Sequence, residues 1–287
     1  MKYGVVLFTS DRGITPAHAA RAAEAAGFDS FAVPEHTHIP VRREAPHPRT
    51  GGGSLPDDRY LRTLDPWVAL ASAASVTRTI RLSTAVALPA EHDPIALAKT
   101  IASLDHLSGG RVTLGIGFGW NTDELADHGV PADRRRTVLR EYIESMRALW
   151  SADEASYEGD FVSFGPSWAW PKPPQQEAGG LPVLLGAGGN ERTFRWIATS
   201  ADGWITTPQD TAIEHQVALL HRIWKDAGRD GLPAVSALAG RPNLDQLARW
   251  ADAGVTEVLF GLPDRSAEDV AGYIDKLAGR LSIAAEL

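Results

Sequence analysis

Glu35 and His36 stand at the end of a short apolar segment, DSFAVP, which spans residues 29–34. An imidazole titrates near neutral pH, so His36 is suited to moving a proton or to polarising a substrate. Because neighbouring side chains of a strand point to opposite faces, only one of the two needs to face a ligand. The pair therefore predicts an acid–base site, and a histidine that is simply hydrogen-bonded inside a loop is the alternative.

A second stretch whose residue types could form a functional site is RVTLGIGFGW, residues 111–120. In this stretch an apolar strand ends among alternating glycines. Glycine allows a sharp turn or the close approach of a ligand because it has no Cβ. Phe118, Gly119 and Trp120 end the stretch, and NTDE follows with the features of a helix start. Such a turn at the carboxyl end of a strand predicts a ligand site. A tight strand–helix turn without a ligand has the same sequence features.

The segment PVLLGAGG, residues 182–189, repeats the pattern of a short apolar strand that ends in glycines. Its last four residues are small: Gly186, Ala187, Gly188 and Gly189. They lead directly into a predicted helix over 190–200, whose positive end and free N–H groups attract an anion. Arg192 adds a positive charge in the first turn. We expect a phosphate group to bind here, with a plain helix start as the alternative.

Other histidines give weaker signals. His92 belongs to EHDP, which is typical of a turn followed by a helix cap, and His38 lies in an irregular segment. The sequence has no H-E-x-x-H motif and no H-x-H on a secure strand, so we expect no metal site. It also lacks G-x-S-x-G, which argues against an acyl-transfer hydrolase.

The elements that must position these residues alternate regularly between strand and helix. Eight strands are expected, at 3–8, 29–34, 80–88, 112–116, 182–189, 202–207, 234–239 and 255–262. Helices follow them, and eight such units in 287 residues predict an α/β fold, a (β/α)8 TIM barrel. A doubly wound open sheet is the alternative, but TSDRG follows the first strand instead of G-x-G-x-x-G.

Two segments interrupt this rhythm, one after the second strand and one after the fourth. Residues 37–65 are irregular and rich in proline, glycine and charge, which is typical of a lid or binding loop. Residues 157–180 predict a small hairpin, YEGDFVSF, followed by an extended proline-rich loop. Because neither segment is long enough to form a domain, we expect one domain over 1–287.

The composition narrows the function classes. Hydrophobic residues make up 44% and charged residues 22%, as in an ordinary globular protein, and the net charge of −8 argues against a nucleic-acid partner. Cysteine is absent, which excludes disulfides and thiol nucleophiles. The start MKYGVVLFTS is unlike a signal peptide, and no apolar run reaches the length of a membrane span. We therefore expect a cytoplasmic protein without a membrane partner.

Four stretches together resemble the bacterial luciferase-like monooxygenase superfamily, in particular its actinobacterial branch of F420-dependent oxidoreductases. The stretches are FAVPEHTHIP, RLSTAVALPAEHDP, LDHLSGGRVTLGIGFGWNTDEL and PVLLGAGGNERTFRWIATSADGW. The resemblance covers nearly the whole chain. It implies a (β/α)8 barrel with a flavin or deazaflavin across its carboxyl face, so coenzyme F420 is the expected cofactor and FMN the alternative.

The resemblance also assigns roles to individual positions. Thr84, Ala85 and Val86 match a bulge, commonly with a non-prolyl cis peptide bond, that supports the cofactor ring from behind. Phe118, Gly119 and Trp120 match the turn along the ring and ribityl chain, and Gly186 to Gly189 match the phosphate-binding turn. His36 matches the group that handles a proton or polarises the substrate, and Glu35 matches a position that contacts the cofactor; we assign both as catalytic.

One position departs from the family pattern. Some deazaflavin dehydrogenases carry a glutamate where this chain has Trp120, and an indole cannot exchange a proton. The nearest acids in sequence are Asp123 and Glu124. The substitution favours a reductase or a monooxygenase over a sugar-phosphate dehydrogenase.

Three functions follow from these observations. The first is F420-dependent hydride transfer to or from a small organic substrate; the second is an FMN monooxygenase that uses O₂ and a separate reductase. A non-catalytic deazaflavin-binding protein is the third. Relatives of this kind often pair through barrel helices, so we expect a homodimer.

Overall fold

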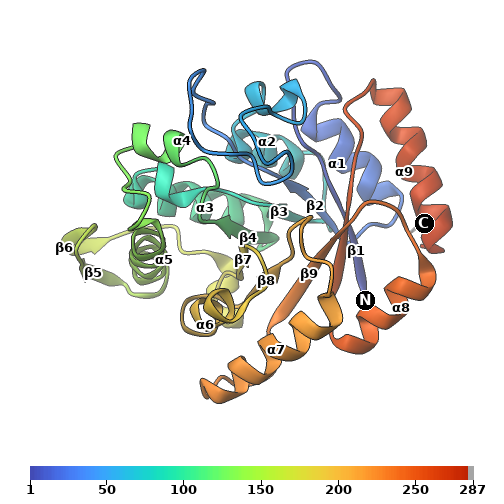
Figure 1. Ribbon diagram of the computed structural model, residues 1–287. Helices are drawn as coiled ribbons and strands as arrows, with labels where there is room; N and C mark the ends of the chain where they lie inside the picture. The colour runs from blue at the N-terminus through green and yellow to red at the C-terminus, as the bar shows by residue number, and fades with distance from the viewer. Residues whose placement is uncertain (284–287) are drawn as a thin grey trace.

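Eight parallel strands close into a barrel in the computed structural model, which describes residues 1–283 (Figure 1). Around the barrel the strands follow the order β1-β10-β9-β8-β7-β4-β3-β2. The barrel strands are β1 (Lys2–Val6), β2 (Ser30–Val33), β3 (Arg81–Thr84), β4 (Val112–Gly117), β7 (Val183–Gly186), β8 (Gly203–Ile205), β9 (Ala234–Ala239) and β10 (Glu257–Gly261). The predicted (β/α)8 TIM barrel is confirmed.

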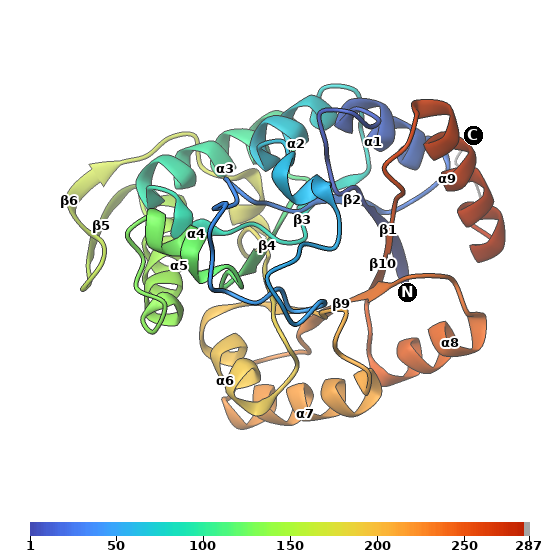
Figure 2. The same cartoon turned by 45° about the horizontal axis from the view of Figure 1, so that its top comes forward.

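Helices form the outer layer of the barrel (Figure 2). They are α1 (Pro16–Ala25), α2 (Pro66–Ala74), α3 (Pro94–Ser108), α4 (Thr122–Asp127), α5 (Arg135–Ser151), α6 (Glu191–Ser200), α7 (Ile213–Asp226), α8 (Leu244–Ala253) and α9 (Ala267–Leu281). The side chains of Asp65 and Asp93 accept hydrogen bonds from the first turns of α2 and α3, each of which begins with proline. These caps explain why both helices begin where the sequence indicates.

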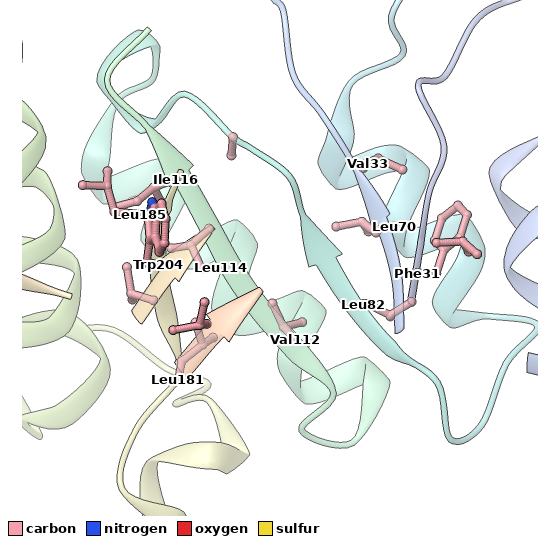
Figure 3. Packing of buried hydrophobic residues seen from close by; sticks show 14 of the residues in the cluster. Phe31, Val33, Leu70, Leu82, Val112, Leu114, Ile116, Leu181, Leu185 and Trp204 are labelled. Carbon is pink, nitrogen blue, oxygen red and sulfur yellow. The ribbon is translucent and has the colours of Figure 1, made fainter. Parts of the chain in front are cut away.

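Apolar side chains fill the barrel and the layer between strands and helices. Figure 3 shows Leu114, Ile116 and Leu185 beside Trp204, which is fully buried. Because parallel strands are covered on both faces, their residues are apolar almost without interruption, and this pattern made the strands predictable.

Irregular segments cover the carboxyl ends of the strands. Residues 37–65 cross this end of the barrel near α4 and contain one short 3₁₀ helix, η1 (Asp58–Leu61) (Figure 2). The hairpin of β5 (Glu154–Glu158) and β6 (Ser163–Trp168) lies outside the barrel, beyond α5 (Figure 1). The predicted irregular segment and the predicted hairpin are both confirmed.

Two predictions of local structure are wrong. The strand expected over 80–88 ends at Thr84, because the chain leaves the ladder at the next residue, and a 3₁₀ turn, η2 (Pro89–Glu91), follows. The proline-rich part of 157–180 is not extended throughout, since Pro174–Ala178 forms a further 3₁₀ helix, η3. In the part of the chain that the structure describes, no helix combines the length and the apolar character needed to cross a membrane.

Candidate active site

A bulge follows β3 at the carboxyl end of the barrel. The peptide bond between Ala85 and Val86 is cis, and Ala87 rejoins the sheet through a bridge to Ile116 of β4. Thr84 ends the regular strand and donates from Oγ1 to the carbonyl of Gly115 at 2.6 Å. The bulge and the cis bond that the resemblance implied are therefore confirmed, while contact of these residues with a cofactor stays a prediction.

Glycines of the neighbouring strands make room for this bulge. A Cβ on Gly117 would lie 2.7 Å from Val86 Cγ2, and one on Gly186 would lie 2.5 Å from Val86 Cγ1. A Cβ on Gly115 would collide with the carbonyl oxygen of Thr84. Since carbon atoms do not approach so closely, β4 and β7 need glycine at these positions to pack against the bulge.

The backbone N–H of Glu35 donates to the carbonyl of Val86 at 3.0 Å, so His36 is the next residue after a direct contact with the bulge. The imidazole of His36 is held by Trp120 and by Glu124 of α4. Its Nδ1 lies 2.8 Å from Glu124 Oε2, and Trp120 Nε1–H donates to its Nε2 at 3.4 Å. This pattern assigns the ring proton to Nδ1 and leaves Nε2 as an acceptor.

Burial alone would raise the pKa of Glu124. The hydrogen bond and charge of His36, together with the backbone N–H groups of Thr37 and His38, lower this pKa instead. His36 is thus a base whose protonated form has a carboxylate partner.

Glu35 is held in a different environment from its neighbour. Its Oε2 accepts the N–H of Leu88 at 2.6 Å, and its Oε1 lies 2.6 Å from His92 Nε2. Burial would lower the pKa of His92, but the hydrogen bond to Glu35 raises it. Because both carboxylate oxygens are engaged and the side chain is buried, the geometry favours a positioning role for Glu35. Its predicted contact with the cofactor stays untested.

Aromatic side chains of the segment 37–65 cover His36. The rings of Tyr60 and Trp120 lie 5.5 and 5.7 Å from the imidazole, and His47 packs edge-on against Trp120 at 4.8 Å. His47 Nε2 also lies 3.1 Å from the hydroxyl of Tyr60. Burial lowers the pKa of His47 and raises that of Tyr60, so both are neutral near pH 7. The segment supplies an apolar wall around a proton-handling group.

Two buried acids, Glu91 and Glu124, meet at the hydroxyl of Thr37, which lies 3.3 Å from Glu91 Oε2 and 3.4 Å from Glu124 Oε1. Burial, together with the charges of Glu124 and Glu35, raises the pKa of Glu91 to about 9. Neither acid was assigned a role from the sequence, although each lies in the segment that follows a barrel strand, Glu91 after β3 and Glu124 after β4. Among the described residues, no three His, Asp or Glu are arranged to hold a metal ion.

The turn at Gly186 to Gly189 differs in part from the predicted phosphate cradle. A Cβ on Gly188 would meet nothing within 4 Å, so this residue borders open space. The N–H of Gly189, however, donates to Asp210 Oδ1 at 2.8 Å, and Trp204 Nε1–H donates to the carbonyl of Ala187. The amide of Gly189 is thus already paired, and the side chain of Asp210 shapes the turn.

Arg136, which packs on Phe118, adds a positive charge that the sequence analysis did not identify, besides the predicted Arg192. The guanidinium of Arg136 stacks on Phe118 at 4.0 Å, and its buried Nη1 has no hydrogen-bond partner within residues 1–283. Burial lowers the pKa of Arg136, and the nearby charges of Arg192 and Arg135 add to the effect. A half-buried guanidinium with one buried nitrogen that lacks a partner favours an anion at this position.

A comparison with known protein families identifies the family of this chain. The sequence model of the luciferase-like monooxygenase family matches residues 14–280. The chain belongs to that family. Its members include both F420-dependent and FMNH₂-dependent enzymes, so the family is one of oxidoreductases and monooxygenases.

Two relatives of this chain are named for different cofactors, F420 and FMNH₂. The uncharacterized protein Rv0953c of Mycobacterium tuberculosis is 68% identical over 98% of this chain and 99% of its own length. An F420-dependent glucose-6-phosphate dehydrogenase of Amycolatopsis mediterranei is 29% identical over 64% of this chain and 50% of its own. An FMNH₂-dependent dimethylsulfone monooxygenase of Pseudomonas fluorescens is 32% identical over 48% and 36%.

Solved structures share the barrel. The monooxygenase RslO1 of Streptomyces bottropensis has a TM-score of 0.75 at 20% identity and covers 98% of this chain and 99% of its own. An F420-dependent secondary alcohol dehydrogenase has a TM-score of 0.75 at 17% identity and covers 99% of both chains. At these identities the likeness concerns the fold alone.

Proposed function

We propose that this luciferase-like protein is an oxidoreductase that uses coenzyme F420 to reduce or oxidise a small organic substrate at the carboxyl face of the barrel. The observation that carries the proposal is the arrangement of His36. Its Nε2 is an acceptor, its Nδ1 is paired with the buried carboxylate of Glu124, and a glycine-lined bulge lies beside it. Together these features supply a general base near a backbone surface that a ligand can approach closely, because glycine has no Cβ.

The residues present fit a deazaflavin. Val86 and its surrounding glycines would support the ring, with Phe118, Gly119 and Trp120 along the ring and ribityl chain. The turn at Gly186 to Gly189 would take the phosphate. Arg136, whose Nη1 lacks a partner among residues 1–283, favours F420 over FMN because the tail of F420 carries carboxylates beyond the phosphate that both share.

When bound, F420 supplies two-electron chemistry by accepting or donating a hydride. The protein supplies the proton chemistry and the shape of the site. His36 accepts a proton at Nε2 from an alcohol-like substrate, or donates it in the reverse direction, while Glu124 stabilises the resulting imidazolium. Tyr60, His47 and Trp120 exclude water around it, which strengthens the ion pair.

The second candidate function is an FMN-dependent monooxygenase, supplied with reduced flavin by a separate reductase. Trp120 favours it, because this position carries no acid, and so does the similarity to an FMNH₂-dependent relative. The third candidate, a protein that binds a deazaflavin without turnover, uses the same cleft residues but needs no poised base.

A titration distinguishes the cofactors. Purified protein is titrated with F420 and separately with FMN, and binding is followed by tryptophan fluorescence, which Trp120 and Trp204 should report. We expect F420 to bind at least about tenfold more tightly, a difference of about 1.4 kcal/mol. Arg136→Gln should reduce this preference, while Arg140→Gln, an exposed arginine of the same helix, should leave it unchanged. Tighter binding of FMN would favour the monooxygenase.

A variant of His36 tests the chemistry. His36→Ala should retain F420 binding and lower turnover by about 10²-fold or more, the usual contribution of a positioned base. His215→Ala, at an exposed histidine of α7, is the matched control and should turn over normally. Full activity of His36→Ala would refute the proposed role. Cofactor binding without turnover of a broad alcohol and carbonyl panel by the unaltered protein would favour the binding protein.

We also propose that the protein is a homodimer. Large apolar side chains are exposed on α2, on α3, at the end of β6 and just after it: Val68, Ile95, Leu107, Trp168 and Trp170. Burying them against a second copy would remove apolar surface from water. Sedimentation equilibrium should give twice the mass of the chain, and Leu107→Lys should shift the protein to monomers.

A further inference from the structure

A chain of hydrogen-bonding groups leads away from the Nδ1 side of His36, opposite the Nε2 that accepts the N–H of Trp120. Glu124 is its first member, since Oε2 lies 2.8 Å from His36 Nδ1, and its Oε1 accepts the N–H of Thr37 at 2.9 Å. The hydroxyl of Thr37 lies 3.4 Å from the same oxygen and 2.8 Å from His128 Nε2. Every contact in this chain joins atoms that can donate or accept a proton.

The members of this chain run from the interior to the surface. The side chains of Glu124 and His36 are 0% and 7% exposed, whereas that of His128 is 28% exposed. Thr37 Oγ1 also lies 3.0 Å from His38 Nδ1, whose ring contacts Asp127 at the surface. Thr37 is therefore the junction between a sealed ion pair and two histidines in contact with water.

The other two acids near Thr37, Glu91 and Glu35, do not compete with Glu124 for the proton of His36. Glu91 Oε2 lies 3.3 Å from Thr37 Oγ1 and 4.0 Å from His128 Nε2. Because burial and the neighbouring carboxylates raise the pKa of Glu91 to about 9, it stays protonated near neutral pH. Glu35 is occupied by His92 and Leu88. Glu124 is thus the acid of this cluster that carries a negative charge and can accept a proton.

We propose that Glu124, Thr37 and His128 form the route by which His36 exchanges its proton with solvent. This inference rests on the proposed function, in which His36 handles a proton during turnover. A route is needed because Trp120, Tyr60 and His47 cover the imidazole on the side of the lid.

The transfer balances without any further reactant. Protonation at Nε2 makes His36 an imidazolium, which passes its Nδ1 proton to Glu124 Oε2 and is left as the neutral Nε2–H form. The resting Nδ1–H form returns when the route runs in reverse to Nδ1 and Nε2 gives its proton to a substrate. A half-turn of the carboxyl group brings this proton to Thr37 Oγ1. The hydroxyl accepts it while giving its own proton to His128 Nε2, and His128 releases a proton from Nδ1 to water. The reverse sequence delivers a proton to His36.

Exchange of the Nδ1 proton of His36 with water tests the route directly, without cofactor or substrate. The rate is measured by NMR on protein with isotope-labelled histidine. Thr37→Val removes the hydroxyl at nearly constant shape, and we expect exchange to slow about tenfold or more, since a positioned proton carrier accelerates transfer by about 10²-fold or more. Thr37→Ser keeps the hydroxyl and should retain the original rate.

Matched controls separate the route from general effects on folding. Thr63→Val removes a hydroxyl that donates to the backbone carbonyl of His36 at 2.9 Å, outside the route, and should leave the exchange rate unchanged. His128→Gln should slow exchange, while His215→Gln should not. The thermal midpoint of each variant shows that it is folded.

Two results would overturn the proposal. An unchanged rate in both Thr37→Val and His128→Gln would exclude the route altogether. Slowing by Thr37→Val alone would overturn the exit through His128 and place it at His38. Failure of the proposed function is recognised in a different experiment, the cofactor titration, in which neither F420 nor FMN would bind. The effects of the variants on the exchange rate do not depend on that result.

Discussion

The two ends of β4 bury charge in opposite ways. At the amino end, the guanidinium of Arg111 donates to the carbonyls of Ile80 and Ser108 at 2.8 Å and to that of Thr77 at 3.1 Å. At the carboxyl end, Glu91 keeps one buried oxygen without a partner within the described chain. The first charge is surrounded by neutral acceptors, whereas the second acid lies among other acids.

The two environments suit different roles: the first stabilises the fold, and the second supports proton chemistry. Neutral acceptors fix Arg111 in one protonation state and tie the ends of α2 and α3 to the barrel. Acids that crowd one another have displaced pKa values, and their protons are available to move. The amino face of the barrel is therefore expected to determine folding, and the carboxyl face to determine reactivity.

The largest expected effect is at the amino end. Arg111→Met removes the donor from several buried carbonyls and should lower the free energy of unfolding by about 3 kcal/mol, since each unpaired polar group costs about 1 kcal/mol or more. Urea denaturation measures this value. Arg140→Met, at an exposed ion pair, is the control and should change it by less than about 0.5 kcal/mol. A change of less than about 0.5 kcal/mol in the free energy of unfolding of Arg111→Met would contradict the expected difference between the two ends of β4.

The carboxyl end should respond to pH instead. Folding raises the pKa of Glu91 from 4.5 to about 9, so the folded protein holds a proton that the unfolded chain releases across this interval. Rising pH therefore lowers the free energy of unfolding, and Glu91→Gln abolishes that dependence. Between pH 5.5 and 8 the variant should gain about 3 kcal/mol relative to the original protein. Parallel pH profiles from denaturant titrations would refute the assignment.

Steric fit at the bulge gives a sharper test with a matched pair. Gly186→Ala places a Cβ against Val86, and overpacking of this kind should cost about 1–3 kcal/mol of stability. Gly188→Ala, two residues later, meets open space and should cost less than about 0.5 kcal/mol. Thermal unfolding compares the two. Equal losses would show that β7 does not depend on contact with the bulge.

The smallest effect concerns His92. Burial lowers its pKa, but the hydrogen bond to Glu35 and the charges of Glu35 and Asp65 together raise it. Its contribution to stability is therefore present below the unfolded value near 6.5 and is lost as pH rises through the higher folded value. His92→Gln should therefore cost more at pH 6 than at pH 9, by about 1 kcal/mol. A cost that does not vary with pH would indicate that His92 stays neutral.

Much of the fold was predictable because its signals are local. Proline after a capping aspartate begins α2 and α3, and glycine ends α3 and α8. The end of β3 was not predictable, because the apolar sequence continues to Leu88. The strand stops where glycines of β4 and β7, remote in sequence, allow the bulge.

The site was predictable to a similar degree. His36 and the glycine turns are marked by their places after strands, so sequence could find them. The partnership of His36 with Glu124 spans 88 positions and depends on the barrel bringing β2 beside the turn after β4. Arg136 was missed because nothing in the helix pattern of α5 distinguishes a buried guanidinium from an exposed one.

The segment over His36 begins and ends at the same place. Thr37 is tied to Glu124 at its start, and near its end Thr63 is tied to the carbonyl of His36 and Leu64 to the hydroxyl of Thr9. Because closing a loop costs only about 0.6 kcal/mol more for each doubling of its length, the parts of the segment other than His47 and Tyr60 can lengthen or shorten at little cost to stability. Under the proposed function, substrate preference can therefore diverge between descendants of this barrel while the hydrogen bonds of His36 are inherited unchanged.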